Sequence, residues 1–488
     1  YSADFKLGLK RDGTFVAYEA MFFQNAGCSA DLSTAILERT LFHATNAYYV
    51  PHVRATAASC RTNLASNTAF RGFGGPQAMF VMECAIREAA DALGLDAAVL
   101  QRRNLLREGD TLPYGMRFPD QPVARGWDEA VAHFDLAARR ARVDAWNATH
   151  RFEKKGLAVM PVCFGISFTT TFMNQAGALV HVYSDGSLSV STAAVDMGQG
   201  TSTKMRRVAA ATLGIDPARV RIESTSTARV ANTSPTAAST GPDLNGHATR
   251  AACLTLRGRL VQVAATALRV ADLSTITLRD ERVHVGGVPT DLGWTALVTA
   301  AFLGRTDLSA HGFYATPGIH FDKATNTGDP FLYHASGTAI VEATVDALRG
   351  TARVDAVHVV HDAGRSLDMI VDRGQVEGGI VQGLGWMTIE EIVHGADGRL
   401  LTDTLTTYKV PDLYEAPREI EVRFLEASTG PAGVLGAKTV GEPPFMYGIG
   451  AWFAIREAMR AFRPGLAMPN VAPVTSERIL MALYPALR

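Results

Sequence analysis

The sequence lacks the closely spaced cysteine pairs that hold metal clusters. It has five cysteines, an odd number, and they are far apart: Cys28, Cys60, Cys84, Cys163 and Cys253. Iron–sulfur clusters and structural zinc sites need several thiolates at short spacing, so we expect neither within this chain. The pattern fits buried thiols in a reducing cytosol, and we therefore expect a cytoplasmic protein.

Long apolar runs, an excess of one charge and nucleotide-binding motifs are also absent. No stretch reaches the roughly 18 uninterrupted apolar residues of a membrane helix, and the N-terminus has no signal-peptide pattern. A net charge of −1 argues against a surface that attracts nucleic acid or anionic membranes. Neither a G-x-G-x-x-G dinucleotide motif nor a G-K-[ST] phosphate loop occurs.

Length and composition predict a well-packed globular protein of several domains. The chain is 47% hydrophobic and 19% charged, as in soluble globular proteins. Its 488 residues are too many for one hydrophobic core, so two or three domains are expected. A loop at residues 116–126 marks a boundary between a first region, residues 1–125, and a second region, residues 126–488. The chain begins at Tyr1 instead of methionine, and we expect it to be part of a longer polypeptide.

Periodicity predicts strands and helices in both regions. Residues 4–24 alternate around an Arg-Asp-Gly turn signal and predict a hairpin, and residues 77–93 carry apolar side chains at helical spacing. Shorter helices are predicted at 36–47 and 96–107. In the second region the predicted helices and strands cover residues 127–151, 178–183, 188–195, 204–213 and 247–268.

The stretch from Thr439 to Phe445 puts one carboxylate in a nearly rigid setting. Pro443 disfavours the helical conformation for the residue before it, so Glu442 is predicted to be extended. Gly441 lets a backbone or ligand approach closely, and residues 445–459 read as a buried helix. A carboxylate fixed at the mouth of such a helix could be a general base. The stretch alone leaves open a capping or ion-pairing glutamate beside a proline turn.

Glycine-rich loops precede several predicted helices. Residues 66–77 interleave Arg71 with glycines, residues 196–202 open the helix at 204, and residues 374–378 open a helix through 392. Such loops aim main-chain amides at an anion. Each loop alone also fits a tight turn into a helix, but together they indicate a large, extended, anionic ligand. Between them, residues 232–241 are small and hydroxyl-bearing, too poor in bulk to form core.

Residues 164–172 alternate with a period of two. This pattern predicts a strand with Phe164, Ile166, Phe168 and Phe172 on one face and Thr169 on the other. Without further context it fits an ordinary sheet core.

A series of motifs resembles one known family. The motifs F-R-G-F-G-G-P-Q, N-Q-A-G-A-L-V, M-G-Q-G, N-T-S-P-T-A-A-S, G-Q-V-E-G and V-G-E-P-P occur in this order. They resemble the molybdopterin-binding domains of the xanthine dehydrogenase/xanthine oxidase family of molybdenum hydroxylases, over nearly the whole chain. The resemblance implies an α+β fold, with two elongated molybdopterin-binding domains of mixed sheets and helices and the cofactor between them. It also implies oxidation of hypoxanthine and xanthine to xanthine and urate, with water as the oxygen source.

The resemblance assigns roles to individual residues. Glu442 resembles the base that takes the proton from a molybdenum-bound hydroxyl, and Arg39 resembles the arginine that pairs with the purine carbonyl oxygen. Phe73 and Phe168 resemble the rings on either side of the purine, and Thr169 a hydroxyl that binds it. The residues that resemble cofactor contacts are Phe70, Arg71, Gly198, Gln199, Ala238, Ser239 and Gln375, of which Arg71, through its backbone, and Ala238 resemble metal-site contacts.

The family pattern is incomplete in this chain. An earlier glycine-rich loop with a second substrate-binding glutamate has no counterpart, and the 2Fe-2S and FAD domains are missing. The resemblance therefore implies partners: an N-terminal molybdenum-domain segment, iron–sulfur and flavin domains or subunits, and a dimer of that assembly. Two alternatives remain, an aldehyde- or N-heterocycle-oxidising molybdenum hydroxylase, and a cofactor-binding fragment without catalysis. Arg39 argues against the aldehyde alternative, because aldehyde oxidases usually lack it.

Overall fold

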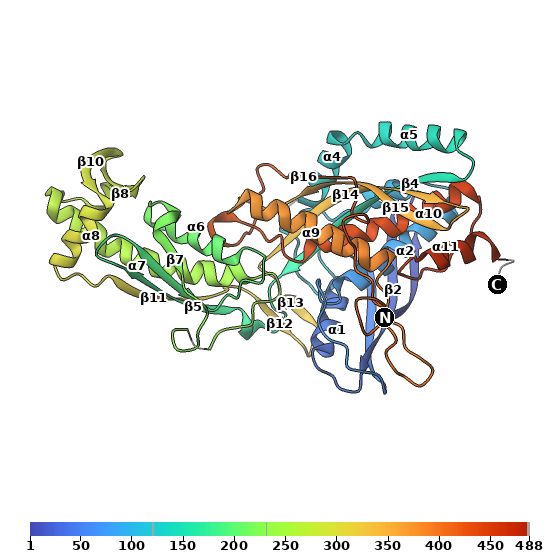
Figure 1. The fold of residues 1–488 in the computed structure, drawn as a ribbon, viewed down its shortest axis with the longest axis horizontal. Helices are drawn as coiled ribbons and strands as arrows, with labels where there is room; N and C mark the ends of the chain where they lie inside the picture. Colours follow the sequence, from blue (N-terminus) through green and yellow to red (C-terminus); the bar gives the residue numbers. More distant parts are fainter. Residues whose placement is uncertain (120–121, 231, 486–488) are drawn as a thin grey trace.

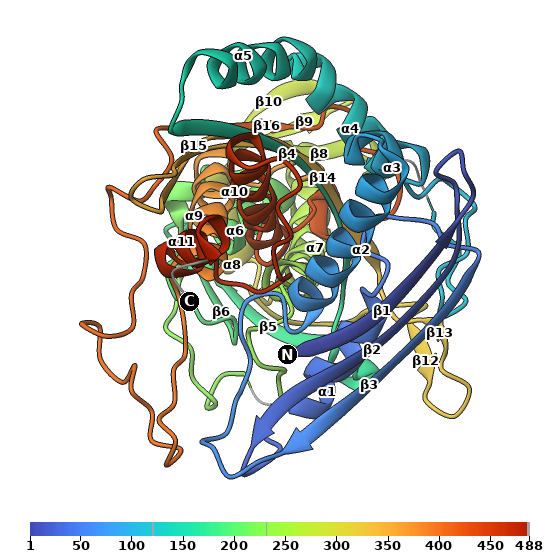
Figure 2. The ribbon, with the colours of Figure 1, turned by 90° about the vertical axis from the view of Figure 1, so that its right-hand side faces the viewer.

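The N-terminal residues form the predicted hairpin. The computed structural model describes residues 1–119, 122–230 and 232–485. β1 (Ser2–Leu9) pairs antiparallel with β2 (Phe15–Gly27), and Gly13 takes a positive φ of 86° in the turn. β3 (His52–Arg61) adds to the other side of β2 in parallel. Figure 2 shows α2 (Gly75–Leu93) lying along this sheet, which it covers with its apolar face.

A second sheet forms the centre of the broad half of the molecule (Figure 1). Its strands, in the order β16-β15-β14-β4, are β16 (Glu419–Phe424), β15 (Thr351–His361), β14 (Tyr333–Asp346) and β4 (Glu153–Ile166). β14 is buried at nearly every position, because two hydrophobic cores lie on its two faces: Val341 belongs to one and Ile340 to the other. α9 (Met369–Thr388) and α10 (Ile449–Phe462) contribute to the first core.

The narrow half has its own hydrophobic core and two small sheets (Figure 1). The four-stranded sheet, in the order β11-β5-β6-β7, consists of β11 (Ser309–Ala315), β5 (Gln175–Val182), β6 (Leu188–Thr192) and β7 (Val220–Ile222). The helices of this half are α6 (Thr201–Leu213), α7 (Gly241–Leu268) and α8 (Trp294–Leu303). The three-stranded sheet consists of β8 (Ile276–Arg279), β9 (Arg282–Val285) and β10 (Val288–Gly293).

The remaining elements lie on the surface of the broad half or between the halves. They are α1 (Ser33–Phe42), α3 (Ala97–Arg103), α4 (Pro122–His133), α5 (Leu136–Thr149), α11 (Ser476–Leu483), β12 (His320–Asp322) and β13 (Thr327–Asp329). Helices and mixed sheets occur in both halves, which confirms the predicted α+β fold. The division into domains at residue 125 stays a prediction.

Several predicted elements are wrong in their limits. The helices predicted over 36–47, 96–107 and 445–459 are α1 (Ser33–Phe42), α3 (Ala97–Arg103) and α10 (Ile449–Phe462), and the strand predicted over 188–195 ends at Thr192.

The loop predicted over 116–126 gives way to α4 at Pro122, since proline is well suited to the first turn of a helix; residues 120–121 lie outside the described part. The helix predicted over 127–151 is broken at Asp135, whose φ is +46°. The strand predicted over 164–172 ends at Ile166, and Phe172 is 74% exposed, not part of a core face.

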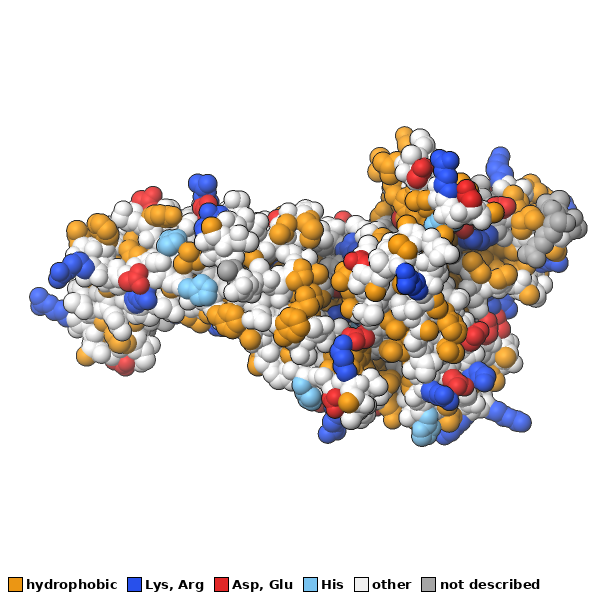
Figure 3. Space-filling view, turned by 90° about the horizontal axis from the view of Figure 1, so that it is seen from below, with side chains coloured by type: hydrophobic (Ala, Val, Ile, Leu, Met, Phe, Trp, Pro, Cys, Tyr) orange, Lys and Arg blue, Asp and Glu red, His pale blue; other side chains and the backbone are white. Residues whose placement is uncertain are grey.

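The cysteines only partly follow the prediction. Cys84, Cys163 and Cys253 are buried, whereas Cys28 and Cys60 are exposed, contrary to the expected buried thiols. Within the residues that the structure describes, no helix has the length and apolar character to cross a membrane. On the face in Figure 3, acidic and basic side chains are interspersed, in keeping with the balanced net charge.

Candidate functional site

A cleft of about 800 Å³ lies where the two halves meet. Its walls come from segments far apart in the sequence: the loop before α2, the loop and first turn of α6, the residues that open α7, and the stretch before the last helices. Nine of the predicted site residues line it: Phe70, Arg71, Phe73, Gly198, Gln199, Ala238, Ser239, Gln375 and Glu442. Folding therefore brings most of the predicted site together.

Glu442 is held in the cleft by neutral hydrogen-bond donors. The Ser239 hydroxyl donates to Glu442 Oε2 at 2.9 Å, and the Gly72 amide donates to Oε1 at 3.2 Å. The Glu442 amide in turn donates to Ser239 Oγ at 2.9 Å. These bonds fix both the backbone and the carboxylate.

The predicted extended conformation of Glu442 is wrong. Its φ of −87° and ψ of −43° are helical, and it precedes the 3₁₀ turn Pro443–Gly448. The steric preference of a residue before proline is local. Here hydrogen bonds to residues in other segments of the chain outweigh it.

The Arg71 loop has an unusual backbone. Gly72, Phe73 and Gly74 all have positive φ values, of 91°, 51° and 92°. A Cβ on Gly74 would lie 2.4 Å from the carbonyl oxygen of Ile36, so no other residue fits there. The non-glycine Phe73 in this conformation indicates strain of the kind found at functional sites. Phe70, 40% exposed, packs edge-on against Phe445 with ring centroids 5.3 Å apart.

The small-residue stretch contributes a second strained pair. Ala238 and Ser239 have φ values of +53° and +58°. Two successive non-glycine residues in the left-handed region are uncommon. They turn the chain into the cleft just before α7.

The M-G-Q-G loop is shaped by its own side chains. Asp196 accepts hydrogen bonds from the Gly198 and Ser202 amides, at 3.0 and 2.9 Å. The Gln199 side chain donates to the Val195 carbonyl oxygen at 2.8 Å. A Cβ on Gly198 would meet no described atom within 4 Å, so this face of the loop is open to the cleft.

Gln375 reaches the cleft from inside a helix. The sequence predicts that Gly374 and Gln375 open a helix, but α9 begins at Met369, where Asp368 accepts a hydrogen bond from the Val371 amide. The prediction of a loop start is therefore wrong, because the aspartate is a better N-cap than a glycine-glutamine pair.

Three predicted site residues lie outside the lining of the cleft as the structure describes it: Arg39, Phe168 and Thr169. Arg39 is buried and donates to the carbonyl oxygens of Gly165, at 2.9 Å, and Ser167. Its guanidinium lies over the rings of Phe164 and Phe331, at 5.0 and 5.4 Å. Burial lowers its pKa, and the charge of Glu442 opposes that shift, so Arg39 is within electrostatic reach of the cleft.

The cleft also contains charged residues that sequence reasoning missed. Lys204 and Asp243 line it and are buried, and Lys204 pairs with the buried Asp372 at 2.5 Å. Asp243 accepts a hydrogen bond from the Tyr333 hydroxyl at 2.8 Å. Burial raises the pKa of Asp243 to about 7. A charged residue inside an otherwise apolar helix face was the available signal.

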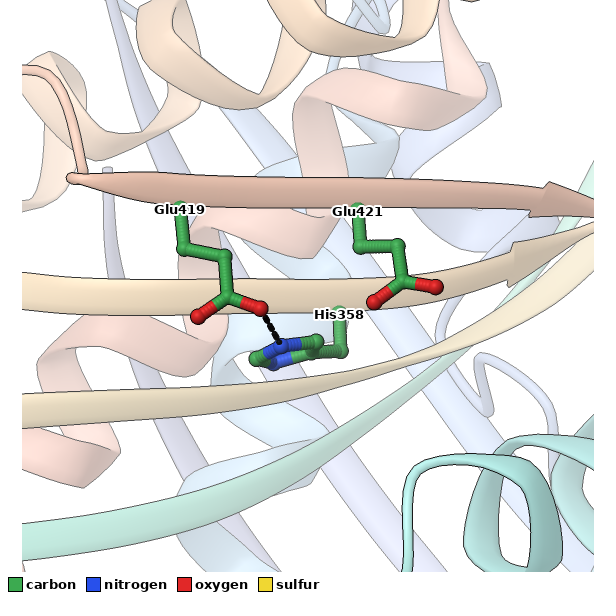
Figure 4. Close-up of side chains that lie close together, drawn as sticks. All are labelled: His358, Glu419 and Glu421. Atoms are coloured by element: carbon green, nitrogen blue, oxygen red, sulfur yellow. Dashed lines mark hydrogen bonds and ion pairs between the residues drawn. The ribbon is translucent and has the colours of Figure 1, made fainter.

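A different cluster of ligand-type side chains lies on β15 and β16 (Figure 4). We call His358, Glu419 and Glu421 the sheet-edge cluster; their ligand atoms lie within 4.8 Å of one another. His358 Nε2 is 2.9 Å from Glu419 Oε1 and also 3.0 Å from Arg139 Nη2. The guanidinium places a positive charge where a metal ion would bind, so the cluster is better explained as an ion-pair network.

Comparisons with known proteins identify the family of this chain. A family model described as molybdopterin cofactor-binding domain matches residues 129–417, and a second model of the same description matches residues 1–105. The chain is 40% identical over 486 residues to xanthine dehydrogenase/oxidase of Mus musculus, covering 98% of this chain and 35% of the relative. It is 39% identical over 494 residues to xanthine dehydrogenase of Oryza sativa subsp. japonica, covering 99% and 34%. The chain thus spans about a third of the length of these relatives.

Solved structures share the fold. Quinoline 2-oxidoreductase from Pseudomonas putida 86 superposes with a TM-score of 0.86 at 25% identity, covering 99% of this chain and 62% of that one. Aldehyde oxidoreductase from Desulfovibrio gigas superposes with a TM-score of 0.82 at 24% identity, covering 99% and 49%. Because one family model alone covers more than half of its residues, the chain belongs to the family of molybdopterin cofactor-binding domains.

Proposed function

We propose that the cleft holds molybdenum-molybdopterin and that the chain is part of a molybdenum hydroxylase that oxidises hypoxanthine and xanthine. The observation that carries this proposal is the carboxylate of Glu442, fixed at the cleft by Ser239 and Gly72. The similarity to xanthine dehydrogenases over nearly the whole chain supports the choice of purines.

The residues of the cleft fit the cofactor. A cleft of about 800 Å³ is within the range of small-molecule sites. The open face at Gly198 leaves space for a flat ring. The residues proposed to hold the cofactor are Phe70, Arg71, Gly198, Gln199, Ala238, Ser239 and Gln375, with Arg71 and Ala238 beside the metal.

Glu442 is proposed as the general base. The Ser239 hydroxyl and the Gly72 amide direct its carboxylate and leave further lone pairs to accept a proton. Both donors are neutral groups. When bound, the cofactor supplies the two-electron acceptor for hydroxylation of the purine, with water as the oxygen source.

Arg39, Phe73, Phe168 and Thr169 are proposed to orient the purine. Arg39 stabilises negative charge that develops on the substrate, for which a buried guanidinium is well suited. Phe73 supplies a ring at the cleft. Phe168 and Thr169 follow directly after the carbonyl of Ser167 to which Arg39 donates, so the three are linked through one short segment.

A second candidate is oxidation of an aldehyde or another N-heterocycle. It is favoured by the position of Arg39, which is bonded to backbone carbonyls and lies outside the cleft lining. A third is a cofactor-binding fragment without catalysis. Because the chain spans about a third of its relatives, we also propose partner segments that carry the iron–sulfur and flavin groups, in a dimeric assembly.

The three candidates are separated by one set of measurements on the complete protein that carries this chain. Molybdenum and pterin are counted per chain, and anaerobic reduction is followed with xanthine, benzaldehyde and quinoline. The proposal expects cofactor to be present and xanthine to reduce it fastest. Faster reduction by benzaldehyde or quinoline would establish the second candidate, and cofactor without reduction by any of them the third.

A further inference from the structure

We propose that the side chain of Arg71 is a positioning residue that fixes the peptide group preceding Glu442, so that the carboxylate faces the cleft. This inference rests on the proposed role of Glu442 as the base. The cofactor contact proposed for Arg71 concerns its backbone, and the side chain has a separate task.

The guanidinium of Arg71 joins three segments of the chain. Nε donates to the Gly441 carbonyl oxygen at 2.7 Å, and Nη2 donates to the same oxygen. Nη1 donates to Gln382 Oε1 at 3.1 Å, and Nη2 also reaches the Gln375 carbonyl oxygen at 3.4 Å. The two acceptors on α9 hold the Arg71 guanidinium against this helix, which belongs to the hydrophobic core. The guanidinium is thus bonded to a rigid helix on one side and to Gly441 on the other.

The peptide group between Gly441 and Glu442 is gripped at both ends. Arg71 binds its oxygen, and Ser239 Oγ accepts a hydrogen bond from its N–H at 2.9 Å. The two gripping residues belong to different halves of the molecule, Arg71 to the loop before α2 and Ser239 to the loop before α7. A peptide plane held by its oxygen and its nitrogen cannot rotate, and this sets the direction of the Glu442 side chain.

The grip lies next to a disfavoured backbone angle of Glu442. A residue before proline is pushed away from the helical region, yet Glu442 has φ −87° and ψ −43°. The disfavoured angle is ψ, which turns the Glu442–Pro443 peptide, whereas Arg71 and Ser239 hold the Gly441–Glu442 peptide on the other side of the Glu442 Cα. Without Arg71 the Gly441–Glu442 peptide would be free to turn, and the carboxylate would lose its alignment with Ser239 and Gly72.

The Arg71 guanidinium is closely packed between α9 and the proline turn. A Cβ on Gly379 of α9 would lie 3.1 Å from Arg71 Nη2 and 2.9 Å from the Cβ of Pro444. The helix therefore approaches both the arginine and the proline turn at a glycine. Burial lowers the pKa of Arg71, and the charge of Glu442 opposes this shift.

The test compares Arg71→Met and Arg71→Lys with a matched control in the complete protein. Arg259→Met is the control, because Arg259 also donates to two carbonyl oxygens, those of Asp307 and Ser309, but lies in the narrow half away from the cleft lining. Hydrogen–deuterium exchange of the peptide 439–445 and steady-state rates per bound molybdenum are measured for each variant. The exchange measurement does not depend on turnover.

We expect faster exchange at 439–445 and a fall in kcat of about 10- to 100-fold for Arg71→Met, because misplacement by about 1 Å costs on the order of 100-fold. KM should change by less than about twofold, since the substrate contacts stay in place. The kcat and the exchange rate of Arg71→Lys should lie between those of the wild type and of Arg71→Met, because an ammonium cannot reproduce the two-pronged hydrogen bonding of a guanidinium. Arg71→Ala should regain activity with added methylguanidine and not with methylammonium.

Unchanged exchange at 439–445 in Arg71→Met would overturn the inference, as would a loss of rate no larger than that of Arg259→Met. Failure of the proposed function has a different signature. If Glu442→Gln is as active as the wild type while Arg71→Met still speeds exchange, the base assignment is wrong and the positioning of the peptide stands.

Discussion

The cleft and the sheet-edge cluster both gather carboxylates near an arginine, but they differ in what the carboxylate is bonded to. In the cleft, the Glu442 carboxylate accepts from the Ser239 hydroxyl and the Gly72 amide, and Arg71 binds the preceding carbonyl. In the sheet-edge cluster, Glu419 is bonded to His358, which also contacts Arg139, and the Glu419 side chain is 58% exposed.

This difference explains why only one of the two is a candidate for chemistry. Neutral donors orient a carboxylate and leave lone pairs on its oxygens that can accept a proton. The partners in the sheet-edge cluster are themselves basic, and solvent reaches the acids. An ion pair with one solvent-exposed partner contributes little to stability.

The largest expected effect comes from removing the carboxylate charge in the cleft. Glu442→Gln should slow reduction by xanthine at least about 100-fold, the lower range for loss of a general base. The amide oxygen can accept from the Gly72 N–H while the NH2 group donates to Ser239 Oγ, so the cofactor should be retained. Rapid-mixing absorbance measures the rate and metal analysis the retention. A near-normal rate of reduction would show that Glu442 is not the base, and the cleft would then have no better claim to catalysis than the sheet-edge cluster.

Arg39→Met should lower purine turnover about 10- to 150-fold, the equivalent of one charge-assisted hydrogen bond of about 1.5–3 kcal/mol. Small aromatic aldehydes lack the purine carbonyl and should be affected much less. The change also leaves the carbonyls of Gly165 and Ser167 without their donor, so Tm should fall. The measurements are the turnover rates on xanthine and on an aromatic aldehyde, together with Tm. Equal losses of rate on both substrates would mean that Arg39 only supports the structure.

Asp243 gives the cleft a pH dependence of stability opposite in sign to that of the sheet-edge cluster. Its folded-state pKa of about 7 lies above the unfolded value of 3.8, so the unfolded chain binds fewer protons between these values and stability falls as pH rises through this window. Asp243→Asn keeps an acceptor for the Tyr333 hydroxyl and should raise stability at pH 8 by on the order of 1–4 kcal/mol. At pH 4 the gain should vanish. Thermal unfolding at both pH values measures it, and an equal gain at both would contradict the assignment.

The smallest effect is expected at the sheet-edge cluster. Glu419→Gln should change the free energy of unfolding by less than about 1 kcal/mol, because the Glu419 side chain is 58% exposed although its partner His358 is buried. The His358 hydrogen bond lowers the pKa of Glu419, so the small contribution is present near neutral pH and is lost as pH falls through that pKa. Denaturant unfolding with and without added zinc measures both points. Stabilisation by zinc that Glu419→Gln abolishes would show a metal site there.

Local patterns were enough to predict several of the regular elements. The hairpin of β1 and β2 and the helix α2 follow from alternation and helical spacing. Gly214 follows the predicted helix 204–213 and ends α6 in the left-handed conformation. These features depend on steric preferences of residues next to one another, which a sequence contains directly. The order of the glycine-rich motifs likewise predicted the family, and the comparisons confirm it.

The conformation of the site residues was decided by tertiary structure. The sequence predicts an extended backbone at Glu442 and a short helix around Arg39, and it gives no reason to join Lys204 to Asp372. In the fold, Arg39 is buried against two carbonyls, and Glu442 is helical because Gly72, 370 positions away, and Ser239, 203 positions away, bind it. Local preference before a proline is a property of two residues, whereas the bonds that overrule it exist only once the two halves of the molecule have met.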